Sequence, residues 1–444
     1  MQVLENVVWW LVLIGVMIMI HELGHFWAAR FFDVKVETFS FGFGPRLFGF
    51  RRGETDYRFS ALLFGGYVRM AGEQMVDAAG VDVSDPRGLL AKPRWQRAII
   101  AFAGPFMNLV LAVGLLTGLY MVKYQKVADE DMRAVIGHVA ADSPAAKAGL
   151  QDGDRLVKLD DKTNPTWEDI DLKQIASAGQ PLFLTVERNG KRFNTSVIPT
   201  LSESTGSGYV GWDERGEVQL AAVEAGYPAE KAGLKKGDIL VAVNGQPIHS
   251  PTKFQEMTRS SGGKPIRIEY QRNGETHTVT VQPVYSKLDG PARWMIGVGQ
   301  QQKLHLIATR LSFPDALRES FRENSKGALL FVQVIEGIIR RSVSARIITG
   351  PIGIAQLSGD AAREGPSAFV MLMSMVSLQL AILNLLPIPI FDGFSILTLA
   401  VEMVMQRDLS LNVKEALFRV GFVFIMMLLA FVIYNDISKI LPAG

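Results

Sequence analysis

The sequence is organised around His21-Glu22-Leu23-Gly24-His25, which directly follows the apolar run from Val7 to Ile20. Residues four apart lie on one face of a helix, so a helix through this stretch brings two imidazole rings to one point. Two imidazoles at this spacing can hold Zn²⁺, and Glu22 beside them can serve as a general base. Ionisable side chains are expensive at membrane depth, so they indicate a functional site there. The alternative is a helix end whose histidines reach for the membrane surface.

The composition indicates a chain that is part membrane protein and part water-soluble. Of its 444 residues, 48% are hydrophobic and 20% charged, which is more apolar than an ordinary soluble protein. A net charge of +2 without a basic stripe argues against a nucleic-acid partner. The chain has no cysteine, so a metal must be held by His, Asp or Glu. The other histidines, His138, His249, His277 and His305, occur singly and are expected to be solvated surface residues.

Four apolar segments are expected to cross the membrane. No small-residue cleavage pattern follows the first, so we expect an uncleaved span rather than a signal peptide. The expected spans are 7–32, 98–122, 368–391 and 420–434, with a polar connection containing Glu402, Arg407, Asp408, Lys414 and Arg419 before the last. Segment 313–341 has one apolar face and is expected to be an amphipathic surface helix, a fifth span being less favoured.

The segment between the first two spans is rich in positive charge, which predicts a cytoplasmic location for it and an external N-terminus. Within it, Phe39, Phe41 and Phe43 alternate with small residues, and a second strand-like stretch runs from Thr55 to Met70. These stretches predict a β-hairpin. It either dips into the membrane beside the histidines or is an ordinary cytoplasmic hairpin.

An internal repeat follows the second span. Pro144, Gly149, Asp154 and Asn189-Gly190 all recur 84 residues later, as Pro228, Gly233, Asp238 and Asn273-Gly274. Each copy predicts a short helix ending at glycine, a Gly-Asp turn, a strand and an Asn-Gly hairpin, and the pattern resembles PDZ domains of bacterial proteases. Segment 200–216, rich in Ser, Gly and charge, is expected to link the copies.

Polar groups enter two later apolar segments. The second span carries Gly104-Pro105, which is expected to kink it, and Asn108, an amide that needs a partner. The third is interrupted by Asn384, and then by Pro387 and Pro389, after which comes Asp392-Gly393. A catalytic zinc takes three protein ligands and leaves one position for water, so Asp392 is the expected third ligand. The alternative is that Asp392 caps a following helix.

Three motifs follow one another along the chain: H-E-x-G-H in the first span, Gly104-Pro105-x-x-Asn108 in the second, and Asn384-x-x-Pro387-x-Pro389-x-x-Asp392-Gly393 in a later one. Together they resemble the site-2 protease family of intramembrane zinc metalloproteases. The resemblance implies His21, His25 and Asp392 as zinc ligands and Glu22 as the base. It also implies that Asn384, Asn108, Pro387 and Pro389 lie near the bound substrate. The chain departs from the family pattern at Phe394-Ser395, where a second glycine and a histidine are often found.

The family further implies what the protein does and where. Its substrates are single-span membrane proteins, such as anti-sigma factors of the sigma-E stress response, and remnant signal peptides. The lipid bilayer is the other partner, and no small-molecule cofactor beyond zinc is expected. The location implied is a bacterial inner membrane, with both termini and both PDZ domains in the periplasm and the active site toward the cytoplasmic side.

The expected fold is a polytopic α-helical membrane protein with about four transmembrane helices, a membrane-associated β-hairpin and two inserted PDZ-type α+β domains. We expect the domains to be 1–128 and 367–444, forming the membrane core, 129–205 and 206–288, the two PDZ domains, and 289–366, an amphipathic helical connector. One rival function is a non-catalytic PDZ membrane scaffold, but a scaffold has no need of Glu22. The other is a zinc-dependent transporter, but the sequence shows no evident inverted repeat.

Overall fold

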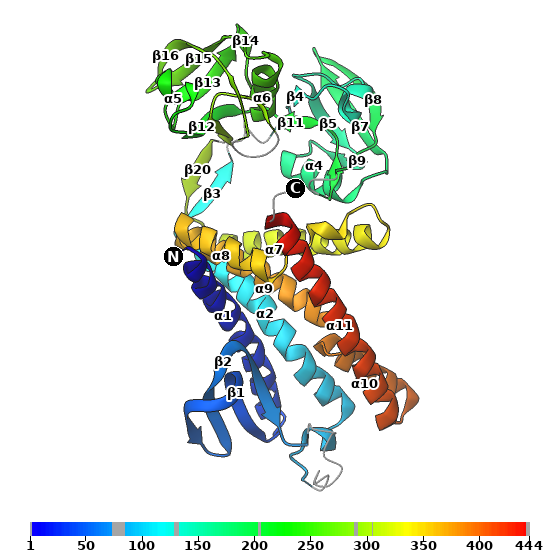
Figure 1. The fold of residues 1–444 in the computed structure, drawn as a ribbon. Coiled ribbons are helices and arrows are strands. Elements are labelled where there is room, and N and C mark those ends of the chain that lie inside the picture. Colours follow the sequence, from blue (N-terminus) through cyan, green and yellow to red (C-terminus); the bar gives the residue numbers. More distant parts are fainter. Residues whose placement is uncertain are drawn as a thin grey trace. The chain divides into compact units, whose positions relative to one another are not determined.

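The computed structural model describes residues 2–72, 85–127, 133–202, 206–287, 292–303 and 305–440 (Figure 1). The chain forms two compact units. The first comprises Met1–Tyr124, Arg310–Val332 and Ile348–Gly444 and contains the long apolar helices. The second comprises Gln125–Thr309 and Gln333–Ile347 and contains the repeated modules.

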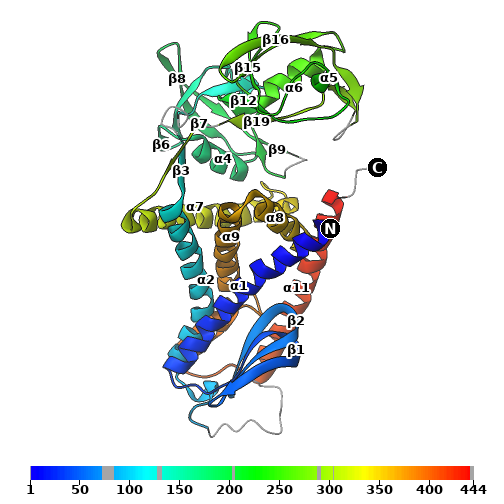
Figure 2. The ribbon, with the colours of Figure 1, turned by 90° about the vertical axis from the view of Figure 1, so that its left-hand side faces the viewer.

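Within the described residues, four helices are long and apolar enough to cross a membrane, as the sequence predicts. They are α1 (Gln2–Phe31), α2 (Arg94–Val122), α9 (Pro366–Leu385) and the segment Asn412–Lys439 of α11 (Leu411–Ile440). Helices α1, α2 and α9 lie side by side (Figure 2). The amphipathic helix expected at 313–341 is α7 (Phe313–Ile339), which is not among the four.

Two expected boundaries in the C-terminal part are wrong. Helix α9 ends at Leu385 because Pro387 and Pro389 follow, and a separate helix, α10 (Asp392–Met405), begins after them. The polar connection expected before the last span is also largely helical, since α11 already begins at Leu411. Apolar content alone misplaced this start, because the first turns of α11 are polar. Lys414 in these turns pairs with the buried Glu402 of α10, with Nζ and Oε1 2.6 Å apart.

The predicted β-hairpin is present as β1 (Val36–Arg52) and β2 (Thr55–Met70). Residues Thr38–Phe41 pair on both sides, with 66–69 along one edge and with 56–59 along the other. The two long strands therefore fold into a small antiparallel sheet whose edges are 66–70 and 46–52. This sheet packs against α1 (Figure 2). The Phe41 ring lies against Gly15 of that helix.

The repeat predicted in the second unit is confirmed by matching elements. In the first module these are β4 (Ile136–Val139), α3 (Pro144–Lys147), β5 (Arg155–Leu159), α4 (Trp167–Ala176), β7 (Leu182–Arg188) and β8 (Lys191–Val197). In the second they are β12 (Glu217–Val223), α5 (Pro228–Lys231), β13 (Ile239–Val243), α6 (Pro251–Ser260), β15 (Ile266–Arg272) and β16 (Glu275–Val281). The sheet orders are β6-β5-β7-β8 and β16-β15-β13-β12-β19.

The two modules also share an internal ion pair and a turn type. Buried Asp154 and Asp238 each accept hydrogen bonds from an arginine, Arg188 at 2.6 Å and Arg272 at 2.7 Å. Both predicted Asn-Gly hairpins have positive φ at both turn residues, as a type I′ turn requires.

The remaining elements are short or connect these parts. They are η1 (Leu89–Ala91), β3 (Tyr124–Val127), β6 (Lys162–Thr163), β9 (Thr200–Leu201), β10 (Gly208–Tyr209), β11 (Trp212–Glu214), β14 (Gln246–Pro247), β17 (Val284–Ser286), β18 (Arg293–Met295), β19 (Val298–Lys303), β20 (Leu306–Thr309), η2 (Ala345–Ile347) and α8 (Pro351–Glu364). The N-terminus of α8 is capped by Asp436 of α11, which accepts hydrogen bonds from three backbone N–H groups.

Segment 200–216, which we expected to link the modules, belongs in part to the fold of the first module. Val210 and Trp212 are buried in the core of the first module, and β11 pairs with β4. Its counterpart in the second module is β19, which pairs with β12, while Ile296 just before it is buried in the second core. Polar composition concealed these strands, because each contributes few apolar side chains. Each module thus ends later in the chain than we expected from sequence.

The expectation that His138 is a solvated surface residue is wrong. Its ring is buried, with Nε2 2.8 Å from a carboxylate oxygen of Glu256 and Nδ1 3.4 Å from one of Asp152. Glu256 belongs to the second module, so the cover over His138 comes from a segment far away in sequence. No local sequence pattern could therefore predict that His138 is buried.

Replacing Trp212 with alanine tests whether this segment belongs to the first module. Removing a buried tryptophan typically destabilises a protein by about 3–5 kcal/mol, so Trp212→Ala should lower the stability of the module by that amount. Ile198→Ala is the control, because Ile198 is 54% exposed and surface changes stay within about 0.5 kcal/mol. Pulse proteolysis of the full chain over a urea series measures both. Equal stability of the two variants would make residues 210–212 a linker after all.

Candidate metal centre

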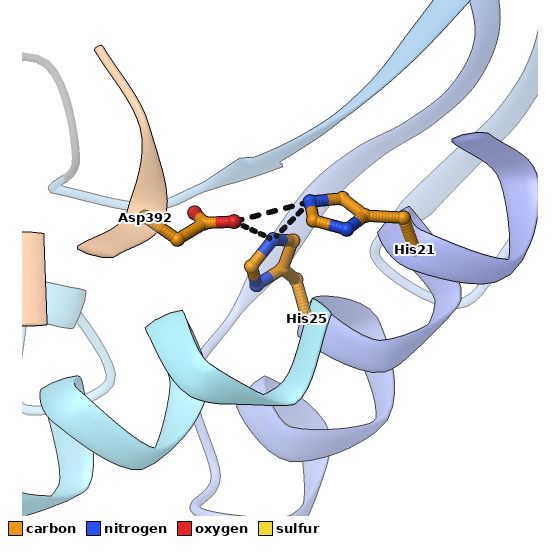
Figure 3. Close-up of side chains that lie close together, drawn as sticks. All are labelled: His21, His25 and Asp392. Carbon is orange, nitrogen blue, oxygen red and sulfur yellow. Dashed lines mark hydrogen bonds and ion pairs between the residues drawn. The ribbon is translucent and has the colours of Figure 1, made fainter. Parts of the chain in front are cut away.

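The two histidines of the first motif point toward each other from consecutive turns of α1 (Figure 3). Their Nε2 atoms are 3.2 Å apart, and both residues are buried. The helix continues through the motif to Phe31, so the spacing of four residues acts as predicted.

Asp392 reaches the same point from the other end of the chain. After the proline segment it is the first residue of α10, whose N-cap is Phe391. Its Oδ2 atom lies 3.1 Å from Nε2 of His21 and 3.5 Å from Nε2 of His25 (Figure 3). The alternative that Asp392 caps the helix is wrong, because the N-cap is Phe391 and the carboxylate of Asp392 faces the histidines.

The backbone before Asp392 is strained. Ile390 has φ of 92°, a conformation that a β-branched residue rarely adopts. Such outliers cost of order 1–3 kcal/mol and persist where the surrounding structure requires them. Here the following segment must turn sharply into α10, where a Cβ on Gly393 would lie 2.3 Å from the carbonyl oxygen of Leu385.

The three side chains fit a zinc ion in number, type and spacing. Their ligand atoms lie within 4.8 Å of one another, and among the described residues they form the group able to hold a metal. Tetrahedral zinc with ligands at about 2.0–2.1 Å separates them by about 3.3 Å, and the observed separations are 3.1, 3.2 and 3.5 Å. Asp392 keeps 24% of its side chain exposed, so one side of the cluster is open to water or substrate.

Two glycines allow α1 and α2 to meet at the cluster. A Cβ on Gly24 would lie 2.2 Å from the carbonyl oxygen of Ala103, and one on Gly104 would lie 2.3 Å from Nε2 of His25. From sequence, Gly104 is expected only to be part of a kink, and its packing role is a further finding of the structure. Small residues that let membrane helices approach closely are the signal that could have found it.

The outer nitrogens of the two rings face α2. Nδ1 of His25 is 2.8 Å from the carbonyl oxygen of Ile100, and Nδ1 of His21 is 3.4 Å from the amide nitrogen of Asn108. Asn108 is fully buried. The structure thus places Asn108 beside a predicted ligand, behind the ring and away from open space.

Glu22 lies on the hairpin side of α1. A Cβ on Gly66 would lie 3.4 Å from Cγ of Glu22, so the edge 66–70 of the sheet runs directly beside this carboxylate. Glu22 is only partly buried, in contrast to the two histidines that flank it.

The other predicted site residues lie on the segment that leads to Asp392. Asn384 is partly exposed in the last turn of α9, Pro387 is exposed, and Pro389 contacts Gly421 of α11. At the position where the sequence departs from the family pattern, Phe394 packs edge-to-face against Phe418 of α11, with ring centroids 6.4 Å apart.

Helices long and apolar enough to cross a membrane, beside a cluster of two imidazoles and a carboxylate, are typical of a membrane-bound metallohydrolase. Comparison with known proteins specifies the class further. Residues 9–428 match the model of Peptidase family M50, so the chain belongs to this family of site-2 type metalloproteases. It is therefore a membrane metalloprotease.

Curated relatives extend over nearly the whole chain. "Regulator of sigma-E protease RseP" of Salmonella typhimurium is 30% identical over 99% of this chain and all of its own length. The protein of that name in Escherichia coli is 29% identical over 97% of this chain and 98% of its own. A protein of Treponema pallidum named "Putative zinc metalloprotease" is 31% identical over 96% and 97%, respectively. Among solved structures, the PDZ domain of an SdrC-like protein of Listeria monocytogenes is 20% identical, with a TM-score of 0.18, and aligns over 20% of this chain and 90% of its own length.

A methyl group at Gly104 should damage the centre. Gly104→Ala places carbon against both histidine rings, so it should abolish proteolysis and lower stability by about 1–3 kcal/mol through overpacking. Gly114→Ala on the same helix is the matched control, because a Cβ there meets no atom of the described chain within 4 Å. Cleavage of a model membrane substrate by the purified variants measures the effect. Full activity in Gly104→Ala would contradict the close approach.

Proposed function

We propose that this protein is an intramembrane zinc protease in which His21, His25 and Asp392 hold the metal and Glu22 is the general base. The observation that carries the proposal is the convergence of three ligand atoms within 4.8 Å between helices that are apolar enough to cross a membrane. Buried ionisable groups at membrane depth are rarely retained without a function.

The residues divide the chemistry among them. Zinc, when bound, supplies a Lewis acid and lowers the pKa of a coordinated water. Glu22, next to the ligands in sequence and only partly buried, accepts a proton from the attacking water and passes it to the leaving amine. The open side of Asp392 admits water and the peptide, while Gly24 and Gly104 close the opposite side by helix packing.

A transmembrane helix must unwind before it is cut, because its carbonyls are hydrogen-bonded within the helix. We propose that the unwound segment adds as a strand to the sheet edge 66–70, beside Glu22. Strand addition satisfies the backbone groups of the peptide where water is scarce. Asn384 and the segment with Pro387 and Pro389 would hold the peptide on the side of Asp392.

The proposed substrates are single-span membrane proteins of the anti-sigma-factor type and remnant signal peptides. This follows the names of the relatives, which regulate sigma-E. The proposed location is a bacterial inner membrane with the basic hairpin segment in the cytoplasm. Both modules, which we assign as PDZ domains, and both termini are then periplasmic. We retain the membrane core as 1–128 and 367–444 and place the PDZ domains over approximately the ranges predicted, with their last strands added.

Separate substitutions distinguish the base from the ligands. Glu22→Gln keeps the size of the side chain but accepts no proton, so it should bind zinc normally and cleave at least 100-fold more slowly. Asp392→Ala removes a ligand and should lower both the zinc content and the cleavage rate. Elemental analysis and cleavage of a single-span substrate by purified protein measure these effects. Retained proteolysis in Glu22→Gln would remove Glu22 from its assigned role.

Proline substitutions test the edge strand. Each proline removes one N–H donor, so changes across 66–70 should impair cleavage at alternate positions, those whose N–H faces the peptide. Losing a buried hydrogen bond costs about 1–3 kcal/mol, which corresponds to a rate loss of roughly 5- to 150-fold. Zinc content is the control for folding. Losses without alternation, or losses that follow the zinc content, would show that the sheet has a structural role only.

A further inference from the structure

The positions of the histidine nitrogens decide which hydrogen bonds the cluster needs. Both rings present Nε2 to Asp392 and to each other, so Nε2 is the metal-binding atom in each. A neutral imidazole that donates a lone pair through Nε2 carries its proton on Nδ1. Each Nδ1–H therefore needs an acceptor, and in metal sites this partner fixes the orientation of the ring.

His25 has such an acceptor in the backbone of α2. Its Nδ1 lies 2.8 Å from the carbonyl oxygen of Ile100. For His21 the group in the equivalent place is the side-chain amide of Asn108, 3.4 Å from Nδ1. The two ligands are thus supported from the same helix, one by main chain and one by a side chain.

The amide of Asn108 can accept from His21 if its oxygen faces the ring. The oxygen and nitrogen of an amide have nearly the same shape, so the hydrogen-bond network decides which end faces a neighbour. With the nitrogen toward His21, two donors meet, and Oδ1 of Asn108 is buried without a partner in the described part of the chain. Turning the amide over brings this oxygen to the Nδ1–H of His21 and gives both groups a partner, while the amide nitrogen moves to the position that Oδ1 leaves.

The surroundings hold Asn108 in this place. It lies one turn along α2 from Gly104, on the face that meets the histidines. Its backbone carbonyl accepts a hydrogen bond of 2.9 Å from Ser377 of α9, and the carbonyl of Ala112 accepts one of 2.9 Å from Ser374. Asn108 itself has no exposed surface, so it cannot touch a peptide in this arrangement.

We propose that Asn108 is a positioning residue, whose side-chain oxygen accepts the Nδ1–H of His21 and so fixes the ring that binds zinc. This inference rests on the proposed function and replaces the expected contact of Asn108 with substrate. Losing such a partner typically weakens metal binding 10- to 100-fold.

The test compares three variants of the full chain purified in detergent. Asn108→Leu removes the acceptor at similar volume and should weaken zinc binding 10- to 100-fold in competition with a chelator. Asn108→Asp keeps an acceptor and should bind zinc at least as tightly as the unmodified protein. Ser377→Ala, which removes the hydroxyl that donates to the backbone carbonyl of Asn108, is the control for helix packing and should change zinc affinity less than threefold.

Spectra of the Co²⁺-loaded protein provide a second readout, because ligand geometry determines the visible bands. Asn108→Leu should alter them, and Asn108→Asp should restore them. The inference is overturned if Asn108→Leu binds zinc normally but fails to cleave, which would assign Asn108 to the substrate. It is also overturned if Asn108→Asp is as weak as Asn108→Leu, which would make the role one of packing. Unchanged zinc binding in His21→Ala would instead reject the proposed metal site itself.

Discussion

The structure depends on the close approach of α1 and α2 at Gly24 and Gly104. Polar groups in an apolar surrounding are stable only if they satisfy one another, and this requires helix backbones close enough for ring nitrogens to reach a neighbouring carbonyl. A side chain at either glycine would collide with backbone or with a histidine ring. The contact therefore sets the position of both imidazoles before any metal is considered.

The other elements of the first unit, which contains the long apolar helices, are arranged around that contact. Helix α9 is fixed to α2 by Ser374 and Ser377, which donate to backbone carbonyls on successive turns. The break after α9 then brings Asp392 to the histidines, with the backbone strain at Ile390 as its consequence. On the other side, the sheet formed by β1 and β2 lies beside Glu22. Glu22, which we propose as the base, thus has the strand edge 66–70 beside it, and Asp392, a proposed ligand, lies against both histidines.

Much of this could be predicted from sequence, because the decisive signals are local. The His21–His25 spacing, the period-two hairpin and the break at Pro387 each act over a few residues. The repeat at 84 residues is found by comparing the chain with itself. The position of a side chain in space also depends on distant segments, so it was harder to predict from the sequence. His138 contacts Glu256 of the other module, and Lys414 near the start of α11 contacts Glu402 of α10. Likewise, only the packing of α1 on α2 reveals that Asn108 lies behind His21 rather than before it.

The candidate centre is assembled from opposite ends of the polypeptide. His21 and His25 emerge from the ribosome first, and Asp392 follows only after both modules have been made. A nascent chain therefore contains His21, Glu22 and His25 for most of its synthesis, before Asp392, the third proposed ligand, has been made. A centre that needs all three proposed ligands cannot hydrolyse peptides in that period. The order of the residues along the chain thus delays proteolytic activity until the last helices have been made.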